Sequence, residues 1–305
     1  MTILVFGSIN MDLVIRTPRL PAPGETIIGH EFFTAGGGKG ANQAVAAARL
    51  AAPTKMIGRV GGDSFGVTLL QQLAESNVDV DSVFVDESVA SGVAIIAVDD
   101  AAQNNIIIAS GANRQVDQTD LERLSHHMPQ AKVLLLQLEI PLDMIVAAAK
   151  LARQHNVTVI LDPAPAQALP AELYPLIDII TPNEIEAGQL VDFPIKTQED
   201  AQHAAQRLLA RGVKTAVIKM GAVGVVYATA ESTDFVPAFS VQAVDTVAAG
   251  DAFNGGLAAG LGEGLALPQA VRWGAATGAL SATKAGAQPS MPTRAEFEAF
   301  LASSQ

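Results

Sequence analysis

The composition of this chain indicates a large folded core with few surface charges. Of 305 residues, 49% are hydrophobic and only 16% are charged, whereas soluble domains average about 25% charged residues; this argues against disorder. The absence of cysteine excludes disulfide scaffolds, thiolate zinc sites and cysteine nucleophiles. A net charge of −12 makes general binding to nucleic acid or to an anionic membrane unfavourable.

The N-terminal residues, MTILVFGSIN, lack the basic and long apolar regions of a signal peptide. No uninterrupted apolar run approaches the roughly 18 residues of a membrane span. We therefore expect a soluble, cytoplasmic protein with small-molecule partners, bound to neither nucleic acid nor membrane.

Short apolar runs alternate with segments of helical character along the chain. The expected strands are Ile3–Phe6, Val133–Leu136, Val157–Leu161, Ile177–Ile180 and Ala216–Ile218. The expected helices are Ala41–Ala52, Phe65–Ser76, Leu121–Met128, Leu142–His155 and Asp200–Arg211, with a helical last third from Ala248 to Ser303. Helix starts are indicated by [ST]-x-x-[DE] spacings at Thr119, Thr197 and Thr293. This alternation predicts an α/β fold with a doubly wound, mostly parallel sheet.

Two regions break the alternation. Leu13–Thr34 is extended and contains several prolines, while Gly92–Asp99 and Asn105–Ala109 are apolar runs joined by a polar turn, which predicts a hairpin. We expect a single domain over 1–305 with a small β-sheet lid inserted from about 13–34 and 91–110.

A glycine cluster, Gly36–Gly40, precedes Ala41 and Asn42. Glycines let a backbone approach a ligand closely, but a tight turn before a helix explains the same residues. The cluster is neither a Walker A loop, because Gly40 follows Lys39, nor a full G-x-G-x-x-G dinucleotide motif.

A second cluster of small residues, Ala248–Gly255, contains Asp251 at the expected start of a helix. Free backbone amides at a helix N-terminus form a natural anion site. Asp251 is either a helix cap or a general base beside a bound phosphate, and the small residues around it favour the base.

Two polar pairs follow expected strands, where ligands of open α/β sheets bind. Asn183 and Glu186 either cap a helix or hold Mg²⁺ through its bound waters. Asn10 and Asp12 point the same way from an extended segment and suit vicinal sugar hydroxyls, although a simple turn is the alternative.

Taken together and in order, the segments GSINMD, GGGKGAN, TPNE, DTVAAGDAFNGG and GAQPSMP closely resemble the ribokinase family of carbohydrate kinases, over Ile3–Leu301. The resemblance implies ATP-dependent phosphorylation of the 5-hydroxyl of D-ribose, with Asp251 as the base and Ala248, Ala249 and Gly250 as the anion hole. It implies a sugar site of Asn10, Met11, Asp12, Gly38, Lys39, Gly40, Asn42, Glu139 and Asp251. It further implies a homodimer formed through the lid.

The resemblance also implies cofactor sites. The nucleotide would lie along Asn183, Glu186, Lys219, Gly221, Gly224, Gly250 and Ala275, with Mg²⁺ near Asn183 and Glu186. A monovalent cation, usually K⁺, would lie by Asp245, Val247, Ser281, Lys284, Gly286 and Ser290, largely through backbone carbonyls. Two positions depart from the family pattern: Lys219 stands where Thr is frequent, and Ala275 where Asn or His often lies by the adenine.

Several functions remain to be distinguished. Within the same class, the substrate could be 2-deoxyribose, fructose or a nucleoside. Outside it, the alternatives are a non-catalytic sugar-binding protein on the same fold and an NAD-dependent oxidoreductase, the latter opposed by the missing G-x-G-x-x-G motif after the first strand.

Overall fold

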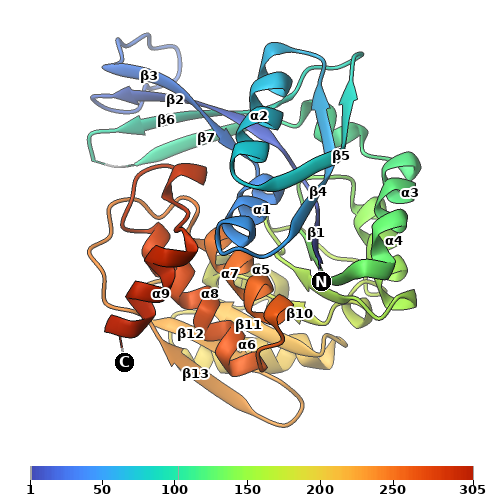
Figure 1. Cartoon of the computed structure of the whole chain (residues 1–305). Helices are drawn as coiled ribbons and strands as arrows, with labels where there is room; N and C mark the ends of the chain where they lie inside the picture. The colour runs from blue at the N-terminus through green and yellow to red at the C-terminus, as the bar shows by residue number, and fades with distance from the viewer. Residues whose placement is uncertain (1, 102, 305) are drawn as a thin grey trace.

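A computed structural model describes residues 2–101 and 103–304. Its main sheet has the strand order β13-β12-β11-β10-β9-β8-β1-β4-β5 and is parallel except for β12 and β13 at one edge. The strands are β1 (Thr2–Phe6), β4 (Thr54–Gly61), β5 (Val78–Asp86), β8 (Ala131–Leu136), β9 (Thr158–Leu161), β10 (Ile179–Ile180), β11 (Thr215–Lys219), β12 (Gly224–Ala228) and β13 (Thr233–Pro237). The α/β prediction with a mostly parallel sheet is thus confirmed, and Figure 1 shows its helices packed around the sheet.

The sheet is buried on both faces because successive side chains of its strands point to opposite sides. In β1, Ile3 and Val5 join one apolar cluster, while Leu4 and Phe6 join the other. The first cluster is formed with α1 (Lys39–Arg49), α2 (Ser64–Glu75), α7 (Ala249–Glu263), α8 (Leu267–Ser281) and α9 (Arg294–Ser303). The second is formed with α3 (Gln118–His127), α4 (Leu142–Gln154), α5 (Glu184–Val191) and α6 (Gln198–Ala210). Short 3₁₀ turns are η1 (Gly111–Gln115), η2 (Met128–Gln130), η3 (Tyr174–Leu176) and η4 (Gln288–Ser290).

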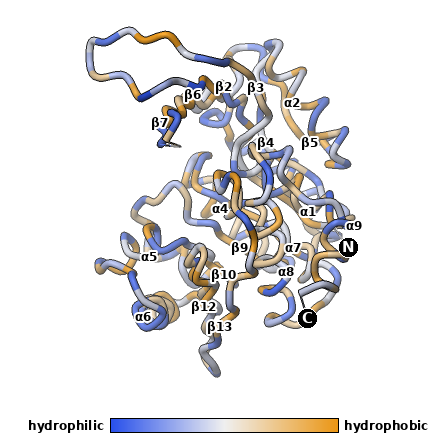
Figure 2. The backbone as a smooth tube through the Cα atoms, turned by 90° about the vertical axis from the view of Figure 1, so that its left-hand side faces the viewer, coloured by the Kyte–Doolittle hydropathy of each residue, from blue (hydrophilic) through white to orange (hydrophobic). Residues whose placement is uncertain are grey.

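A second sheet of four strands, ordered β3-β2-β6-β7, forms from the two regions that break the alternation. Its strands are β2 (Asn10–Thr17), β3 (Glu31–Gly37), β6 (Gly92–Asp99) and β7 (Asn104–Ala109), and β6 and β7 pair as the predicted antiparallel hairpin. Figures 1 and 2 show this small sheet, hereafter the lid sheet, at the end of the molecule opposite β13 and α6. Its strand β2 begins at Asn10, so the lid sheet contains Asn10, Met11 and Asp12, which were expected in the sugar site.

Two of the three predicted helix starts are confirmed. Thr197 and Thr293 cap α6 and α9, each in a reciprocal capping box with the acidic residue three positions later. The prediction at Thr119 is wrong, because Asp117 caps α3 and forms the box with Asp120. Asp117 has the same three-residue spacing to an acidic partner and is itself a favoured cap residue.

Among the described residues, we find no helix with the length and apolar character needed to span a membrane.

Candidate active site

The two polar residues expected to hold a sugar lie together at the start of β2. Asn10 and Asp12 are separated by one residue, so their side chains leave the strand on the same face. Asp12 pairs with Ala35 of β3, and a methyl group added to neighbouring Gly37 would lie 2.3 Å from the Asp12 carboxylate oxygens. Gly37 therefore makes room for a side chain of this chain, a role that the sequence interpretation of the glycines did not include. Met11, between the two polar residues, is buried in the core, so only its backbone faces this region.

A buried residue that the sequence did not single out fixes the orientation of Asn10. The Asn113 side chain, in η1, accepts a hydrogen bond from Ile9 N (2.9 Å) and donates to Ile9 O (3.0 Å) and to Asn10 Oδ1 (2.7 Å). Because Asn10 Oδ1 is thereby occupied, the Asn10 amide group presents its NH₂ donor to any ligand.

The glycine cluster starts helix α1 beside this pair. Gly38 caps the helix with φ of 88°, and a methyl group there would lie 2.7 Å from Asn10 N, so both the left-handed backbone and the close packing require glycine. A methyl group on Gly40 would likewise lie 2.7 Å from Ser8 N. Glu139, just beyond β8, accepts hydrogen bonds from Ser8 Oγ and Lys39 N and so joins this cluster.

Asp251 is buried in the first turn of α7 and faces α1. Its carboxylate accepts hydrogen bonds from Asn42 Nδ2 (2.9 Å) and Gln43 Nε2 (3.1 Å), which are side chains of another helix. The helix is capped by Ala248, which offers no side-chain hydrogen bond. The Asp251 carboxylate therefore does not cap α7.

The amides at the start of α7 are only partly used. Ala249 N donates to Thr246 O (3.2 Å), whereas Gly250 N has no hydrogen-bond partner within the described parts of the chain. Gly250 carries no side chain, so this donor at the positive end of the helix is open to an anion.

A chain of buried polar groups connects Asp251 to the other side of the site. Gln43 Nε2 also donates to Asp162 Oδ2 (3.0 Å), and Lys219 Nζ donates to Asp162 Oδ1 (3.1 Å). Gln43 Oε1 in turn accepts from Gln137 Nε2 (2.8 Å). Sequence reasoning missed Gln43, Gln137 and Asp162, although Asp162 directly follows β9 at the end of the sheet where ligands bind.

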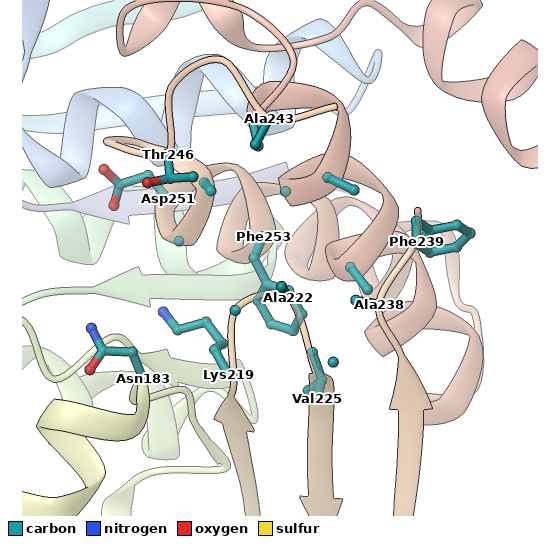
Figure 3. Close-up of a pocket in the computed structure, with 18 of the residues that line it drawn as sticks. Asn183, Lys219, Ala222, Val225, Ala238, Phe239, Ala243, Thr246, Asp251 and Phe253 are labelled. Carbon is teal, nitrogen blue, oxygen red and sulfur yellow. The ribbon is translucent and has the colours of Figure 1, made fainter. Parts of the chain in front are cut away.

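A cavity of about 720 Å³ opens at this end of the sheet. Its lining includes every residue expected along the nucleotide: Asn183, Glu186, Lys219, Gly221, Gly224, Gly250 and Ala275. Figure 3 shows Lys219 and Asn183 extending toward the same part of the pocket, with Asp251 across from them. The cavity therefore joins the expected nucleotide residues to the expected base.

The helix-cap interpretation of Asn183 and Glu186 is confirmed by the structure. Asn183 Oδ1 accepts from Ile185 N and Glu186 N, and Glu186 Oε2 accepts from Asn183 N, so the pair forms a capping box at α5. Each residue still has one polar atom, Asn183 Nδ2 and Glu186 Oε1, without a hydrogen bond to the described residues, and both side chains line the cavity.

The site concentrates carboxylates in a place that water reaches poorly, and this shifts their titration. Burial, together with the nearby charges of Glu139 and Asp251, raises the pKa of Asp12 to about 7. Burial also raises the pKa of Asp251 and of Glu186. Burial alone would lower the pKa of Lys39, but the carboxylates around it outweigh that effect and raise it.

The residues expected around a monovalent cation meet behind the start of α7. Asp245 Oδ1 accepts from Val247 N (3.0 Å) and Asp245 Oδ2 from Gly286 N (2.9 Å), which ties two loops together. The hydroxyls of Ser281 and Ser290 are 2.7 Å apart, while the Lys284 ammonium points to Glu296 (2.6 Å). No group of three or more His, Cys, Asp or Glu suited to a metal is found among the described residues.

Comparison with known proteins now decides the family. Residues 2–294 match the pfkB family carbohydrate kinase. The chain belongs to the pfkB family of carbohydrate kinases. It is therefore a phosphotransferase, and no support remains for a dinucleotide-dependent oxidoreductase.

Members of the pfkB family with assigned substrates resemble this chain over almost its whole length. It is 43% identical over 300 residues to the ribokinase of Haemophilus influenzae, covering 98% of each chain, and 34% identical over 302 residues to the deoxyribokinase of Salmonella typhi, covering 99% of each. The structure of Arabidopsis thaliana ribokinase complexed with ribose and ATP superposes with a TM-score of 0.90 at 34% identity, covering 98% of each chain.

Proposed function

We propose that this protein transfers the γ-phosphoryl group of ATP to the 5-hydroxyl of D-ribose. The observation that carries the proposal is the position of Asp251. Its buried carboxylate lines the cavity, lies close enough to Asp12 to contribute to that residue's raised pKa, and follows the open Gly250 amide by one residue. Relatives named ribokinases support ribose as the acceptor, and the structure of one ribokinase is complexed with ribose and ATP.

In the proposed mechanism, Asn10 donates to a sugar hydroxyl and Asp12 accepts from one or two more. Asp251 receives the proton of the attacking hydroxyl as the new oxygen–phosphorus bond forms, because a free alcohol is too weak an acid to ionise beforehand. The raised pKa of Asp251 brings its basicity closer to that of a useful base. The Gly250 amide stabilises the charge on the transferred group.

The donor sets suit the two cations that the family resemblance implies. Glu186 has a carboxylate oxygen free toward the cavity, which suits Mg²⁺ with its bound waters, while the free Asn183 Nδ2 would donate to a phosphate oxygen. For K⁺, the loops that Asp245 joins through Val247 N and Gly286 N would supply the backbone carbonyls that the resemblance assigns to the ion. When bound, these ions would neutralise phosphate charge and strengthen the electrostatics of the helix end.

The lid sheet supports a further proposal, a homodimer formed through its outer face. Ile15, Phe32, Ile95 and Ile107 are exposed, and strand pairing places them on one face because Ile95 is opposite Ile107 and Ile15 is opposite Phe32. A group of apolar side chains of this kind typically marks an association surface.

A coupled assay that follows ADP release would test the substrate. ATP is the phosphoryl donor, and the acceptors compared are ribose, 2-deoxyribose, fructose and nucleosides, each with and without K⁺. We expect the highest kcat/KM for ribose. The second candidate is 2-deoxyribose, because a deoxyribokinase shares this fold at 34% identity. A higher kcat/KM for 2-deoxyribose or a nucleoside would overturn the ribose assignment, and no turnover with any of them would favour a non-catalytic sugar-binding protein.

The base assignment predicts that Asp251→Asn lowers kcat by at least about 1,000-fold, within the range of general acid–base contributions. Calorimetry should show ribose binding largely retained. Asp143→Asn is a matched control, since Asp143 is an exposed aspartate in the first turn of α4, away from the cavity. Near-normal turnover of the Asp251 variant would show that another group takes the proton.

A further inference from the structure

Lys219 places a positive charge at the inner end of the cavity. It is the last residue of β11, and its backbone N donates to Pro182 O (2.9 Å), which fixes it beside the Asn183 loop. Its side chain is only 13% exposed and extends into the pocket (Figure 3).

The Lys219 ammonium has spare hydrogen-bonding capacity. An ammonium has three donors, and within the described chain only Asp162 Oδ1 is bonded to it, at 3.1 Å. That contact holds the lysine in place, because Asp162 is itself buried and anchored by Gln43. The remaining donors are free to bind an anion.

The ammonium lies beside the open amide at the start of α7. A methyl group added at Gly250 would lie 3.3 Å from Lys219 Nζ. The lysine ammonium therefore lies next to the Gly250 backbone, in the same part of the cavity.

The cavity needs this charge. Its described lining contains two cationic side chains, Lys39 and Lys219, against four carboxylates, Asp162, Glu184, Glu186 and Asp251. A phosphate group entering such a site is repelled unless cations are placed at close range, because Coulomb energies rise steeply in a poorly solvated pocket.

We propose that Lys219 is a catalytic residue whose ammonium, held by Asp162, donates hydrogen bonds to the oxygens of the transferred phosphoryl group together with the Gly250 amide. The sugar oxygen forms a bond to the γ-phosphorus, the bridging bond to the β-phosphate breaks with its electron pair leaving on ADP, and the hydroxyl proton goes to Asp251. Lys219 stays charged throughout and stabilises the transferring group. This inference rests on the proposed phosphoryl transfer, but it does not depend on which sugar is the acceptor.

The rival explanation is that Lys219 only neutralises Asp162, and three variants separate the two. Lys219→Met removes the ammonium but keeps much of the side-chain length. Asp162→Asn removes the carboxylate and keeps the ammonium. The double variant removes both charges, so it leaves no unpaired buried ion that would hinder folding.

Single-turnover phosphorylation rates are measured at saturating ATP and sugar, with sugar affinity from calorimetry. Lys219→Met should slow transfer about 100-fold or more, as loss of a transition-state donor typically does, with sugar affinity changed less than about threefold. Asp162→Asn should be slowed less than Lys219→Met, because the ammonium is retained. The double variant should stay within about threefold of Lys219→Met.

Two results would overturn the proposal: a Lys219→Met rate within threefold of the unmodified protein, or recovery of the double variant by more than tenfold over Lys219→Met. The second result would show that Lys219 acts only as a counter-ion. Failure of the proposed function is separate, because it would appear as absent phosphorylation by the unmodified protein. If that protein prefers 2-deoxyribose, the same comparison is made with that sugar.

Discussion

Asp12 occupies a position where its own negative charge is unfavourable. Burial and the charges of Glu139 and Asp251 raise its pKa from 3.8 to about 7. A carboxylate accepts hydrogen bonds from two sugar hydroxyls, whereas the protonated acid has less acceptor capacity. The protein therefore keeps a group that titrates near neutral pH in its proposed sugar site.

This predicts pH-dependent sugar binding. If the ionised Asp12 binds ribose, affinity should be about tenfold weaker at pH 6 than at pH 8, because roughly a tenth of a group with a pKa of about 7 is ionised at pH 6. Calorimetry without nucleotide measures this directly. Asp12→Asn should bind more weakly and with little pH dependence; an undiminished pH dependence in that variant would assign it to another group.

Stability should respond in the opposite sense. The folded-state pKa of Asp12 lies above the unfolded value of 3.8, so its protonation favours the folded state. This contribution is fully present below about pH 4 and is lost as the pH rises through about 7. Asp12→Asn removes the buried charge, so it should raise Tm, and by more at pH 8 than at pH 5. The same variant is thus expected to bind sugar more weakly and to be more stable.

Residues with a distinctive local pattern could be predicted from sequence, and those defined by tertiary contacts could not. Asp251 was recognisable because small residues surround it at a helix start. Gln43, Asp162 and Asn113 are ordinary polar residues in the sequence, and they acquire roles only through partners more than 100 positions away, such as Asp162 with Gln43 and Asn113 with Ile9. A single sequence carries no signal for such pairing.

At the scale of elements, η1 connects the lid sheet to the sugar site. It follows β7 after one residue, and its Asn113 holds both backbone groups of Ile9 and the side chain of Asn10. Asn113 therefore links η1 directly to the residue that is expected to donate to the sugar.

Asn113→Ala is expected to raise the KM for ribose about tenfold, while the KM for ATP changes little. The substitution frees the Asn10 side chain and leaves buried Ile9 backbone groups without partners, which also costs about 1–3 kcal/mol of folding free energy. Steady-state kinetics and thermal unfolding measure the two effects. Arg114→Ala, an exposed change in the same turn, should alter neither, and an unchanged ribose KM in the Asn113 variant would refute the positioning role.

The elements themselves were predicted unevenly, and the reason is their pattern of side chains. Apolar strands at the centre of the sheet, such as β1 and β8, were found because both faces are buried. β5 has no continuous apolar run, the feature on which strands were predicted; its VDVDSVFVD segment instead alternates apolar with acidic or polar residues, which is the pattern of a half-buried strand. β4 was missed because Lys, Arg and two glycines interrupt its TKMIGRVG segment. The start of α3 was misplaced by two residues, since Asp117 and Thr119 both offer cap-like spacings.

At the scale of the molecule, a net charge of −12 opposes the approach of an anionic nucleotide from a distance. At physiological ionic strength, charges farther away than about 8 Å are largely screened. The groups that matter are those within the cavity: Lys39, Lys219 and the open amide at Gly250. Overall charge therefore limits nonspecific association with polyanions without preventing the site from holding a phosphate.

The proposed dimer gives the last prediction. Ile107 lies on β7, the edge strand of the lid sheet beside β6, and is 68% exposed, so burying it against a second copy would remove it from water. Ile107→Lys should therefore convert a dimer into a monomer of 31.5 kDa in size-exclusion chromatography with light scattering. Val67→Lys is a matched control, because Val67 on α2 is equally exposed, at 68%, outside the lid. A monomeric mass for the unmodified protein at micromolar concentration would refute the dimer, and the same loss of mass in both variants would show that the lid face is not the specific interface.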